Sequence, residues 1–163
     1  MTVRRLTPLE YERLQGYPDG WTDIPGQKNV SDDEVTWWIE VFYQYDRAIS
    51  KKPNRVKRKG EKAIRKWLKK PASDSARYKA LGNSIALPFW RWMLKRMSAY
   101  LPKGATLGSL FDGISGFPLS WAKINGASTC RWSSEIEGFP IAVATKHFGD
   151  EEKGLEGDIE NFL

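Results

Sequence analysis

The stretch SLFDGISGFPL, residues 109–119, decides how the second half of the chain folds. It overlaps an apolar run, residues 105–111, that has the composition of a buried strand, and it leads into residues 118–125, which have the composition of a helix. Glycines at such a junction let the backbone approach a ligand closely and leave N–H groups free at a helix N-terminus. The stretch therefore predicts a strand–turn–helix unit with a binding turn at its centre.

The residues that follow repeat this alternation. Residues 128–134 are expected to form a second strand and residues 139–148 a second helix, an order that indicates a parallel sheet with crossover helices. Glu135, at the end of the second strand, lies 22 residues beyond Gly113, the distance at which an acid accepts hydrogen bonds from ribose hydroxyls. Asp158 follows a third strand position and is a candidate for an adenine amino group. Together these features favour an adenosine-containing ligand.

Charge divides the chain into residues 1–21, an insert at 22–72, and the remainder. The net charge is +6, and residues 47–70 hold twelve Lys or Arg but a single acid, Glu61. Such a run is compatible with a polyanion partner, although a solvated helix face is the alternative. The candidate contacts to a DNA backbone are Arg55, Lys57, Arg58, Lys59, Lys62, Arg65 and Lys66.

Helices are expected in the first two parts. Thr7, Pro8 and Glu10 form a capping box with proline at the first helical position. Residues 31–34 carry a second start signal, and apolar residues then recur at helical spacing as far as residue 49. The aromatic stripe at 37–42 is interpreted as core or interface rather than a base-stacking platform. A basic helix is expected at 61–70 and another helix, rich in aromatics, at 88–100.

Composition limits the class of protein. The chain has 163 residues, of which 40% are hydrophobic and 28% charged, which is typical of a globular domain. No apolar run reaches the roughly 18–20 residues of a membrane span, and no signal peptide is expected. Cys130 is the single cysteine, which excludes an internal disulfide and fits a cytoplasmic setting. We interpret it as a buried core residue.

Six strings in the sequence resemble five conserved motifs of DNA cytosine-5 methyltransferases. Residues 109–119 resemble the first motif, SEIEGF at 134–139 the second, and GDI at 157–159 the third. RLTPLE at 5–10 with RLQGYPD at 13–19 is similar to the ninth, and RYKALGNSIALP at 77–88 to the tenth. Residues 22–72 resemble no family.

The order of these motifs resembles that of a circularly permuted methyltransferase, because the ninth and tenth precede the first. Permutation is tolerated where the two termini of a domain lie close together on the surface. The resemblance implies an α/β fold: a partial Rossmann-like sheet of the S-adenosylmethionine-dependent methyltransferases, with packed N-terminal helices and a helical basic insert. The implied domains are a methyltransferase-like cofactor half at 1–21 and 73–163, and the insert at 22–72.

The resemblance also implies the residues of an S-adenosylmethionine site. The turn after the first strand would hold the methionine and ribose end, and Glu135 the ribose hydroxyls. Ser115 stands where the family has glycine, and its side chain is expected to crowd the turn. The implied cofactor-binding residues are Phe111, Asp112, Gly113, Gly116, Glu135, Ile136, Asp158, Asn83 and Ser84.

The catalytic cysteine of the family has no counterpart. The family attacks cytosine with the thiolate of a Pro-Cys pair, and no such pair occurs in this sequence. Cys130 follows Thr129, and no target-recognition region is present. The first hypothesis is therefore the S-adenosylmethionine-binding portion of a permuted or split DNA (cytosine-5-)-methyltransferase, inactive alone, with the catalytic cysteine on another chain or in a lost downstream segment. Its expected partners are DNA and a complementary chain or a second copy, without a membrane. The second is a methyltransferase remnant from a phage or mobile element that binds DNA or protein and inhibits a nuclease or defence system.

Overall fold

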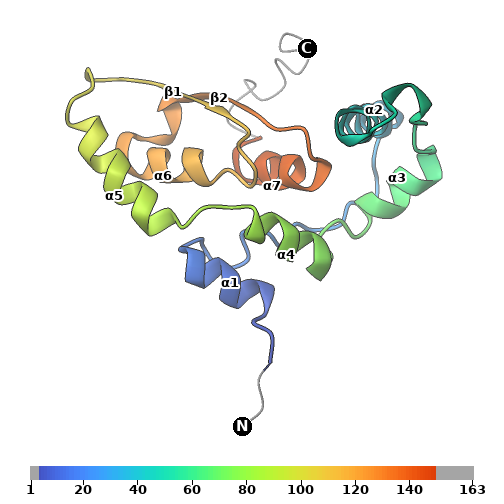
Figure 1. Ribbon diagram of the computed structural model, residues 1–163, viewed down its shortest axis with the longest axis horizontal. Coiled ribbons are helices and arrows are strands. Elements are labelled where there is room, and N and C mark those ends of the chain that lie inside the picture. Colours follow the sequence, from blue (N-terminus) through green and yellow to red (C-terminus); the bar gives the residue numbers. More distant parts are fainter. Residues whose placement is uncertain (1–3, 150–163) are drawn as a thin grey trace.

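A computed structural model describes residues 4–149 of the chain (Figure 1). Helices and one small sheet alternate along the second half, and the first half is helical. The elements are α1 (Pro8–Gln15), α2 (Asp32–Ile49), the 3-10 turn η1 (Pro53–Arg55), α3 (Glu61–Leu68), α4 (Asp74–Gly82), α5 (Leu87–Ser98), β1 (Leu107–Leu110), α6 (Gly116–Asn125), η2 (Ala127–Thr129), β2 (Cys130–Ser134) and α7 (Gly138–Phe148). The predicted helices and both strands that fall within this range are confirmed.

The sheet consists of two parallel strands in the described part of the chain. β1 pairs with β2 from Leu107 opposite Cys130 to Leu110 opposite Ser134. Parallel neighbours require a crossover connection, and α6 supplies it, as the alternation in the sequence predicted. Cys130 is buried at the start of β2, which confirms its interpretation as a core residue.

Helix α1 begins and ends where local sequence signals place its limits. The Thr7 backbone N–H donates to Glu10 Oε2 at 2.7 Å, and the Glu10 N–H donates to Thr7 Oγ1 at 3.3 Å, which completes the capping box. The helix stops at Gly16, whose φ of +81° favours glycine. A Cβ there would also press on the Pro88 ring, so this glycine lets the end of α1 lie against the start of α5.

The main core joins the segment after α1 to the second half of the chain. Tyr17 and Trp21, from the segment after α1, pack with Leu81 of α4, Ile114 of the turn after β1 and Val143 of α7. The Trp21 indole N–H donates to the Ile114 carbonyl at 2.8 Å. The N-terminal segment is thereby fixed directly to the turn that the sequence singled out.

A buried carboxylate holds this N-terminal segment in place. Glu12 of α1 is fully buried and accepts hydrogen bonds from the backbone N–H groups of Gly20 and Thr22, both at 2.8 Å, and from the Thr22 hydroxyl. Arg77 of α4 pairs with the same carboxylate at 3.2 Å and donates to Thr22 Oγ1 at 2.9 Å. Burial acts to raise the pKa of Glu12, but the hydrogen bonds outweigh it and the pKa lies below its usual value.

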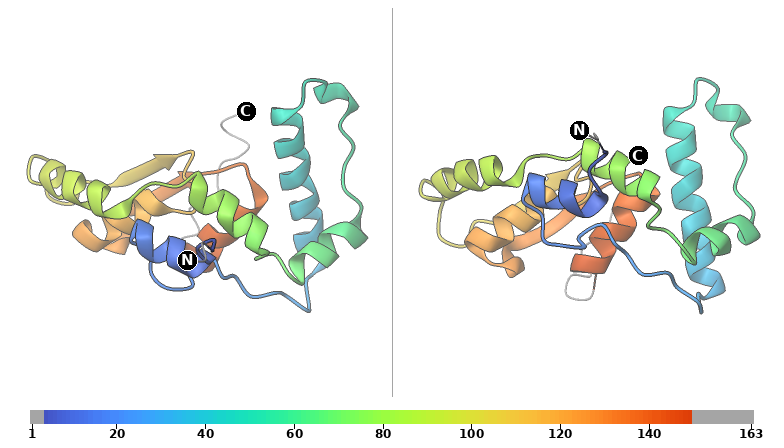
Figure 2. Two further views of the ribbon diagram at one scale, coloured as in Figure 1. Left: turned by 60° about the horizontal axis from the view of Figure 1, so that its bottom comes forward. Right: turned by 90° about the horizontal axis from the view of Figure 1, so that it is seen from below.

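Helices α2 and α3 pack against each other around a second core. Val35, Trp38 and Val41 of α2 meet Ile64 and Leu68 of α3, and this cluster continues to Ile141 of α7. The rings of Trp38 and Trp67 meet edge to face at 4.9 Å. The interpretation of the aromatic stripe as core is confirmed for Trp38, whereas Trp37 is 44% exposed. Helices α2 and α3 stand beside α7 at one end of the molecule (Figure 2). The division of the chain into two domains stays a prediction.

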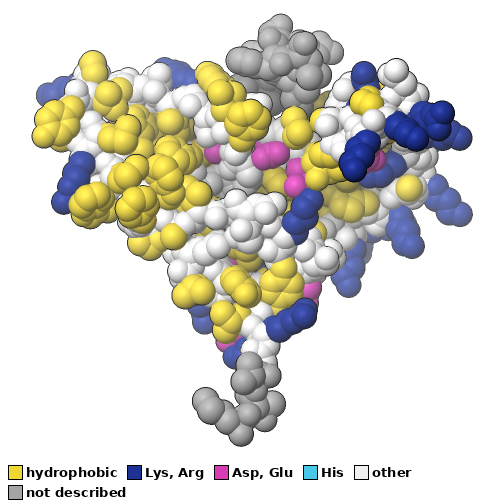
Figure 3. Space-filling model, in the orientation of Figure 1, with side chains coloured by type: hydrophobic (Ala, Val, Ile, Leu, Met, Phe, Trp, Pro, Cys, Tyr) yellow, Lys and Arg dark blue, Asp and Glu magenta, His cyan; other side chains and the backbone are white. Residues whose placement is uncertain are grey.

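One face of the molecule remains apolar and exposed. In Figure 3 hydrophobic side chains gather over α5 and the strands. Within residues 4–149, neither outer edge of the sheet is paired. None of the helices in this range has the length and apolar character of a membrane span. The large exposed hydrophobic residues of this region are Phe89, Trp92, Met97, Tyr100, Leu101, Leu110, Phe111, Trp132 and Ile136.

We predict that Glu12→Gln lowers the free energy of unfolding by about 3 kcal/mol, because it leaves the Arg77 charge poorly compensated in a buried place. Since the pKa of Glu12 is depressed in the folded protein, its stabilisation is present above the unfolded value near 4.5 and is lost as pH falls below it. Urea unfolding at pH 7 and at pH 3.5 measures both effects.

The control is Asp19→Asn, which removes an exposed ion pair with Arg13 and should change stability little at pH 7. Equal stability of Glu12→Gln and the wild type at pH 7 would contradict the role assigned to this carboxylate.

Candidate functional site

A small cleft lies at the turn between β1 and α6. Its volume is about 100 Å³, smaller than a whole nucleoside cofactor needs, so it can hold one end of such a ligand. Its lining combines the end of α4 with the turn after β1, segments that are far apart in the sequence. The lining residues are Asn83, Ser84, Ile85, Ser109, Leu110, Phe111, Asp112, Gly113, Gly116 and Phe117.

The end of α4 is held against this turn by Tyr17. The Tyr17 hydroxyl and Ser84 Oγ are 2.5 Å apart, and Gln15 Nε2 donates to the Leu81 carbonyl at 2.7 Å. Gly116 lies directly under the Tyr17 hydroxyl, where an added Cβ would collide with it. Gly116 therefore serves the packing of the N-terminal segment as well as lining the cleft.

Asp112 supplies a carboxyl group to the cleft. Its N–H donates to the Ser134 carbonyl at 3.0 Å, and its Oδ1 accepts from the Ser109 hydroxyl at 2.6 Å. Burial raises the pKa of Asp112 to about 6, against the hydroxyls of Ser109, Ser115 and Ser133, which lower it. Oδ2 is buried without a well-oriented hydrogen-bond partner in residues 4–149, so the group can take a donor or a cation from a ligand.

Glu135 joins the ends of the two strands. Its Oε2 accepts from the Gly113 N–H at 2.7 Å, and its Oε1 accepts from the N–H groups of Ile136 and Glu137 at 2.7 and 2.9 Å. Glu135 and Ile136 are not part of the lining of the described cavity. Because a carboxylate oxygen accepts two hydrogen bonds, Oε2 keeps one acceptor position for a ligand hydroxyl.

Two apolar side chains near the turn are exposed. The Phe111 side chain is 86% exposed, and its backbone has a φ of +54°, a strained conformation for this residue type. Ile136, after β2, is 40% exposed. An exposed ring on a strained turn beside the cleft is suited to contact a flat apolar ligand surface.

Ser115 lies within the turn, and the expectation that its side chain crowds a bound cofactor stays a prediction. Its side chain is buried and outside the cleft lining, and its Oγ lacks a well-oriented hydrogen-bond partner in the described residues. The reason for a glycine here is the backbone, since Ser115 has a φ of +61° at the start of α6.

The remaining predicted site residues fall into two groups. Asp158, the candidate for the adenine amine, lies outside the described residues. The basic residues of the insert are far from the cleft, on α3 and the linker before it. Among these, Arg58 pairs with Glu40, and Lys59 pairs with Asp46. Arg58 and Lys59 are therefore paired with acids of α2.

Three supports of the site escaped the sequence reasoning. Tyr17 and Lys79 belong to the quoted strings and Trp21 lies two residues after one of them, but nothing local indicates what they contact. Lys79 Nζ donates to Glu137 Oε1 at 2.6 Å and to the Tyr45 hydroxyl at 3.1 Å, which raises its pKa, chiefly through Glu137. It connects α4, the insert and the turn after β2.

Comparison with known proteins gives one informative similarity. Over 100 residues, 60% of the chain, the sequence is 38% identical to a DNA N-6-adenine-methyltransferase of Escherichia phage P1. The matched region spans 11% of that protein, so the chain corresponds to a small part of it. No protein-family profile and no solved structure matches the chain. The chain is thus similar to part of a DNA methyltransferase.

We predict that Ser115→Gly raises the free energy of unfolding by about 1 kcal/mol, because glycine adopts a positive φ without strain. Ser115→Ala is the matched control, since it removes the same hydroxyl but keeps a Cβ at the strained position. Thermal unfolding should place the glycine variant about 2–4 °C above the alanine variant. Equal melting temperatures would show that the strain assigned to Ser115 is absent.

Proposed function

We propose that this chain is the S-adenosylmethionine-binding portion of a DNA methyltransferase whose sequence order is permuted. The observation that carries the proposal is the cleft, in which Asn83 and Ser84 of the tenth-motif string meet the turn of the first-motif string. The similarity to part of a phage DNA methyltransferase supports the same reading. The Tyr17–Ser84 contact adds the ninth-motif string to this arrangement.

The described residues fit such a cofactor. S-adenosylmethionine supplies a methyl group on a positively charged sulfur, beside a charged amino acid end. Asp112, with a buried oxygen that lacks a well-oriented partner, would hold the charged end in the cleft. Glu135 would accept the ribose hydroxyls, and Phe111 and Ile136 would contact the adenine. Asp158 completes the proposed site on the evidence of the sequence.

We propose that the two strands belong to a larger Rossmann-like sheet, completed by a second chain. A sheet of two strands leaves both of its edges unpaired. Parallel sheets in known folds are also covered by helices on both faces. The exposed Leu110, Phe111 and Trp132 lie on or beside these strands, where further strands and helices would cover them. The chain matches 11% of a longer methyltransferase, as expected of a portion that works inside a larger assembly.

The proposed target base is cytosine, because the motif strings resemble those of the cytosine-5 enzymes. That chemistry needs a thiolate to attack the ring, and Cys130 is buried at 5% exposure with its sulfur near the Pro118 carbonyl. The chain is therefore expected to be inactive alone. Adenine N6, the target in the name of the phage relative, is the alternative.

A second candidate function is that of a binding protein derived from a methyltransferase. Such a protein would bind DNA or another protein and thereby inhibit a nuclease or a defence system. The basic surface of the insert favours it, because residues 22–72 have no counterpart in the resembled family. This candidate requires no occupied cofactor site.

Calorimetric titration with S-adenosylmethionine tests the first proposal. We expect the wild type to bind, and Glu135→Ala to weaken binding by roughly ten- to a hundredfold, because hydrogen bonds to a charged group are lost. Glu137→Ala, on the same turn but paired with Lys79, is the matched control and should bind like the wild type. Absence of binding by the folded wild type would favour the second candidate.

Complementation tests the target base. The chain is mixed with a candidate complementary chain that carries a Pro-Cys pair, together with duplex DNA and S-adenosylmethionine. We expect 5-methylcytosine in the digested nucleosides, measured by mass spectrometry, and none from either chain alone. Appearance of N6-methyladenine instead would contradict the proposed base and keep the methyltransferase assignment.

A further inference from the structure

Six cations of the insert, on α3 and just before it, fall into two groups in the structure. Arg58 and Lys59 pair with acids of α2, and they also lie over aromatic rings: the Arg58 guanidinium is 4.1 Å from the Tyr43 ring centre, and the Lys59 ammonium is 4.1 Å from that of Phe42. These contacts fix the linker before α3 to α2. Both side chains are engaged in holding the insert together.

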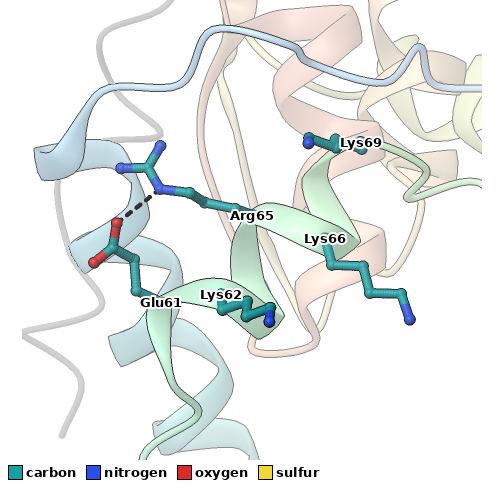
Figure 4. A pocket seen from close by; sticks show the side chains of 5 residues that line it. All are labelled: Glu61, Lys62, Arg65, Lys66 and Lys69. Atoms are coloured by element: carbon teal, nitrogen blue, oxygen red, sulfur yellow. Dashed lines mark hydrogen bonds and ion pairs between the residues drawn. The ribbon is translucent and has the colours of Figure 1, made fainter.

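Arg65 belongs to the same structural group. It donates to Glu61 at 2.8 Å and to the Val30 carbonyl at 2.8 Å, and it pairs with Asp32. Figure 4 shows its guanidinium turned back toward Glu61. Its charge is thus offset by two acids, so Arg58, Lys59 and Arg65 are less available to DNA than the sequence suggested.

The second group lies on the outer face of α3. Lys62, Lys66 and Lys69 are exposed and, within residues 4–149, take part in no side-chain hydrogen bond or ion pair. They line an open hollow of about 700 Å³ together with Glu61 and Arg65, which neutralise each other. Lys62 and Lys66 extend from the same side of the helix (Figure 4). The hollow therefore presents the charge of three free lysines.

The spacing of these lysines suits a chain of phosphates. Positions four and seven residues apart share one helix face, and the rise of 1.5 Å per residue places them about 6 and 10 Å apart along it. Lysine carries a compact charge on a flexible stem. It therefore binds a phosphate as a point charge and does not need the planar, bidentate geometry of arginine. The backbone under Lys69 is also fixed, because Gly26 lies against its carbonyl and the Gln27 N–H donates to the Leu68 carbonyl.

We propose that the outer face of α3, formed by Lys62, Lys66 and Lys69, is a sequence-independent contact for the phosphates of double-stranded DNA. The inference rests on the proposed function, which makes DNA the polyanion expected beside this chain. The face stands at the α2–α3 end of the molecule, where Lys and Arg side chains dominate the surface in Figure 3. It holds the duplex and leaves recognition of the base sequence to the complementary chain. Arg55 and Lys57, exposed in the linker, are secondary contacts.

The test measures binding of a mixed-sequence duplex to the full chain by fluorescence anisotropy over a series of salt concentrations. The variant Lys62→Gln/Lys66→Gln/Lys69→Gln keeps residues of similar helix propensity. Three lost phosphate contacts should lower the slope of log affinity against log salt by roughly 3 and weaken binding at low salt on the order of tenfold or more.

The matched control is Lys95→Gln/Lys103→Gln/Lys123→Gln, which removes the same charge from exposed positions outside the insert. We expect it to keep a slope near that of the wild type. Equal weakening by both variants would reduce the effect to net charge and overturn the proposal. So would an unchanged slope in the α3 variant, or a wild type that fails to bind duplex DNA at low salt.

Titration with S-adenosylmethionine separates this inference from the proposed function. The α3 variant should bind the cofactor as the wild type does, because the cleft is distant from α3. If the wild type binds DNA through these lysines but does not bind S-adenosylmethionine, the DNA surface stands and the methyltransferase proposal fails. If cofactor binding holds and the lysines have no effect, the surface alone is wrong.

Discussion

The buried carboxylate of Glu12 is the constraint on which the rest of the structure depends. By accepting hydrogen bonds from Gly20 and Thr22, it fixes the segment that carries Trp21, and Trp21 in turn donates to the carbonyl of Ile114 in the turn after β1. A buried charge is stable only when it is compensated, and Arg77 of α4 provides the opposite charge. One carboxylate thereby orders α1, α4 and the turn.

The same arrangement brings residues from distant parts of the sequence together at one cleft, as the proposed permuted order requires. The residues that meet at the cleft come from α4 and from the turn after β1, and α5 runs between them along the chain. Tyr17 touches both sides of the junction, through its hydroxyl contact with Ser84 and its packing on Gly116. Contacts of this kind depend on where residues lie in space and not on their order in the chain, which is compatible with the proposed permutation.

Local features could be predicted from the sequence, and long-range ones could not. The limits of α1 follow from Thr7, Glu10 and Gly16, which lie close together in the sequence and have known preferences for helix ends. The pairing of Glu12 with Arg77 spans 65 residues and leaves no periodic signal. Likewise the basic run predicted a charged surface, but only the structure separates Arg65, turned toward Asp32, from Lys66. The left-handed backbone at Ser115 cannot be inferred from serine itself; the hint in the sequence is the glycine that the resembled family has there.

The central claim is that segments from the two parts of the sequence form one cofactor site. Amide nuclear magnetic resonance of the full chain during titration with S-adenosylmethionine tests it most directly. The account predicts that the amide signals of Asn83 and Ser84 shift together with that of Gly113, along one saturation curve, while those of Lys62 and Lys66 stay unchanged. Shifts confined to one of the two segments, or absent from both, would contradict it.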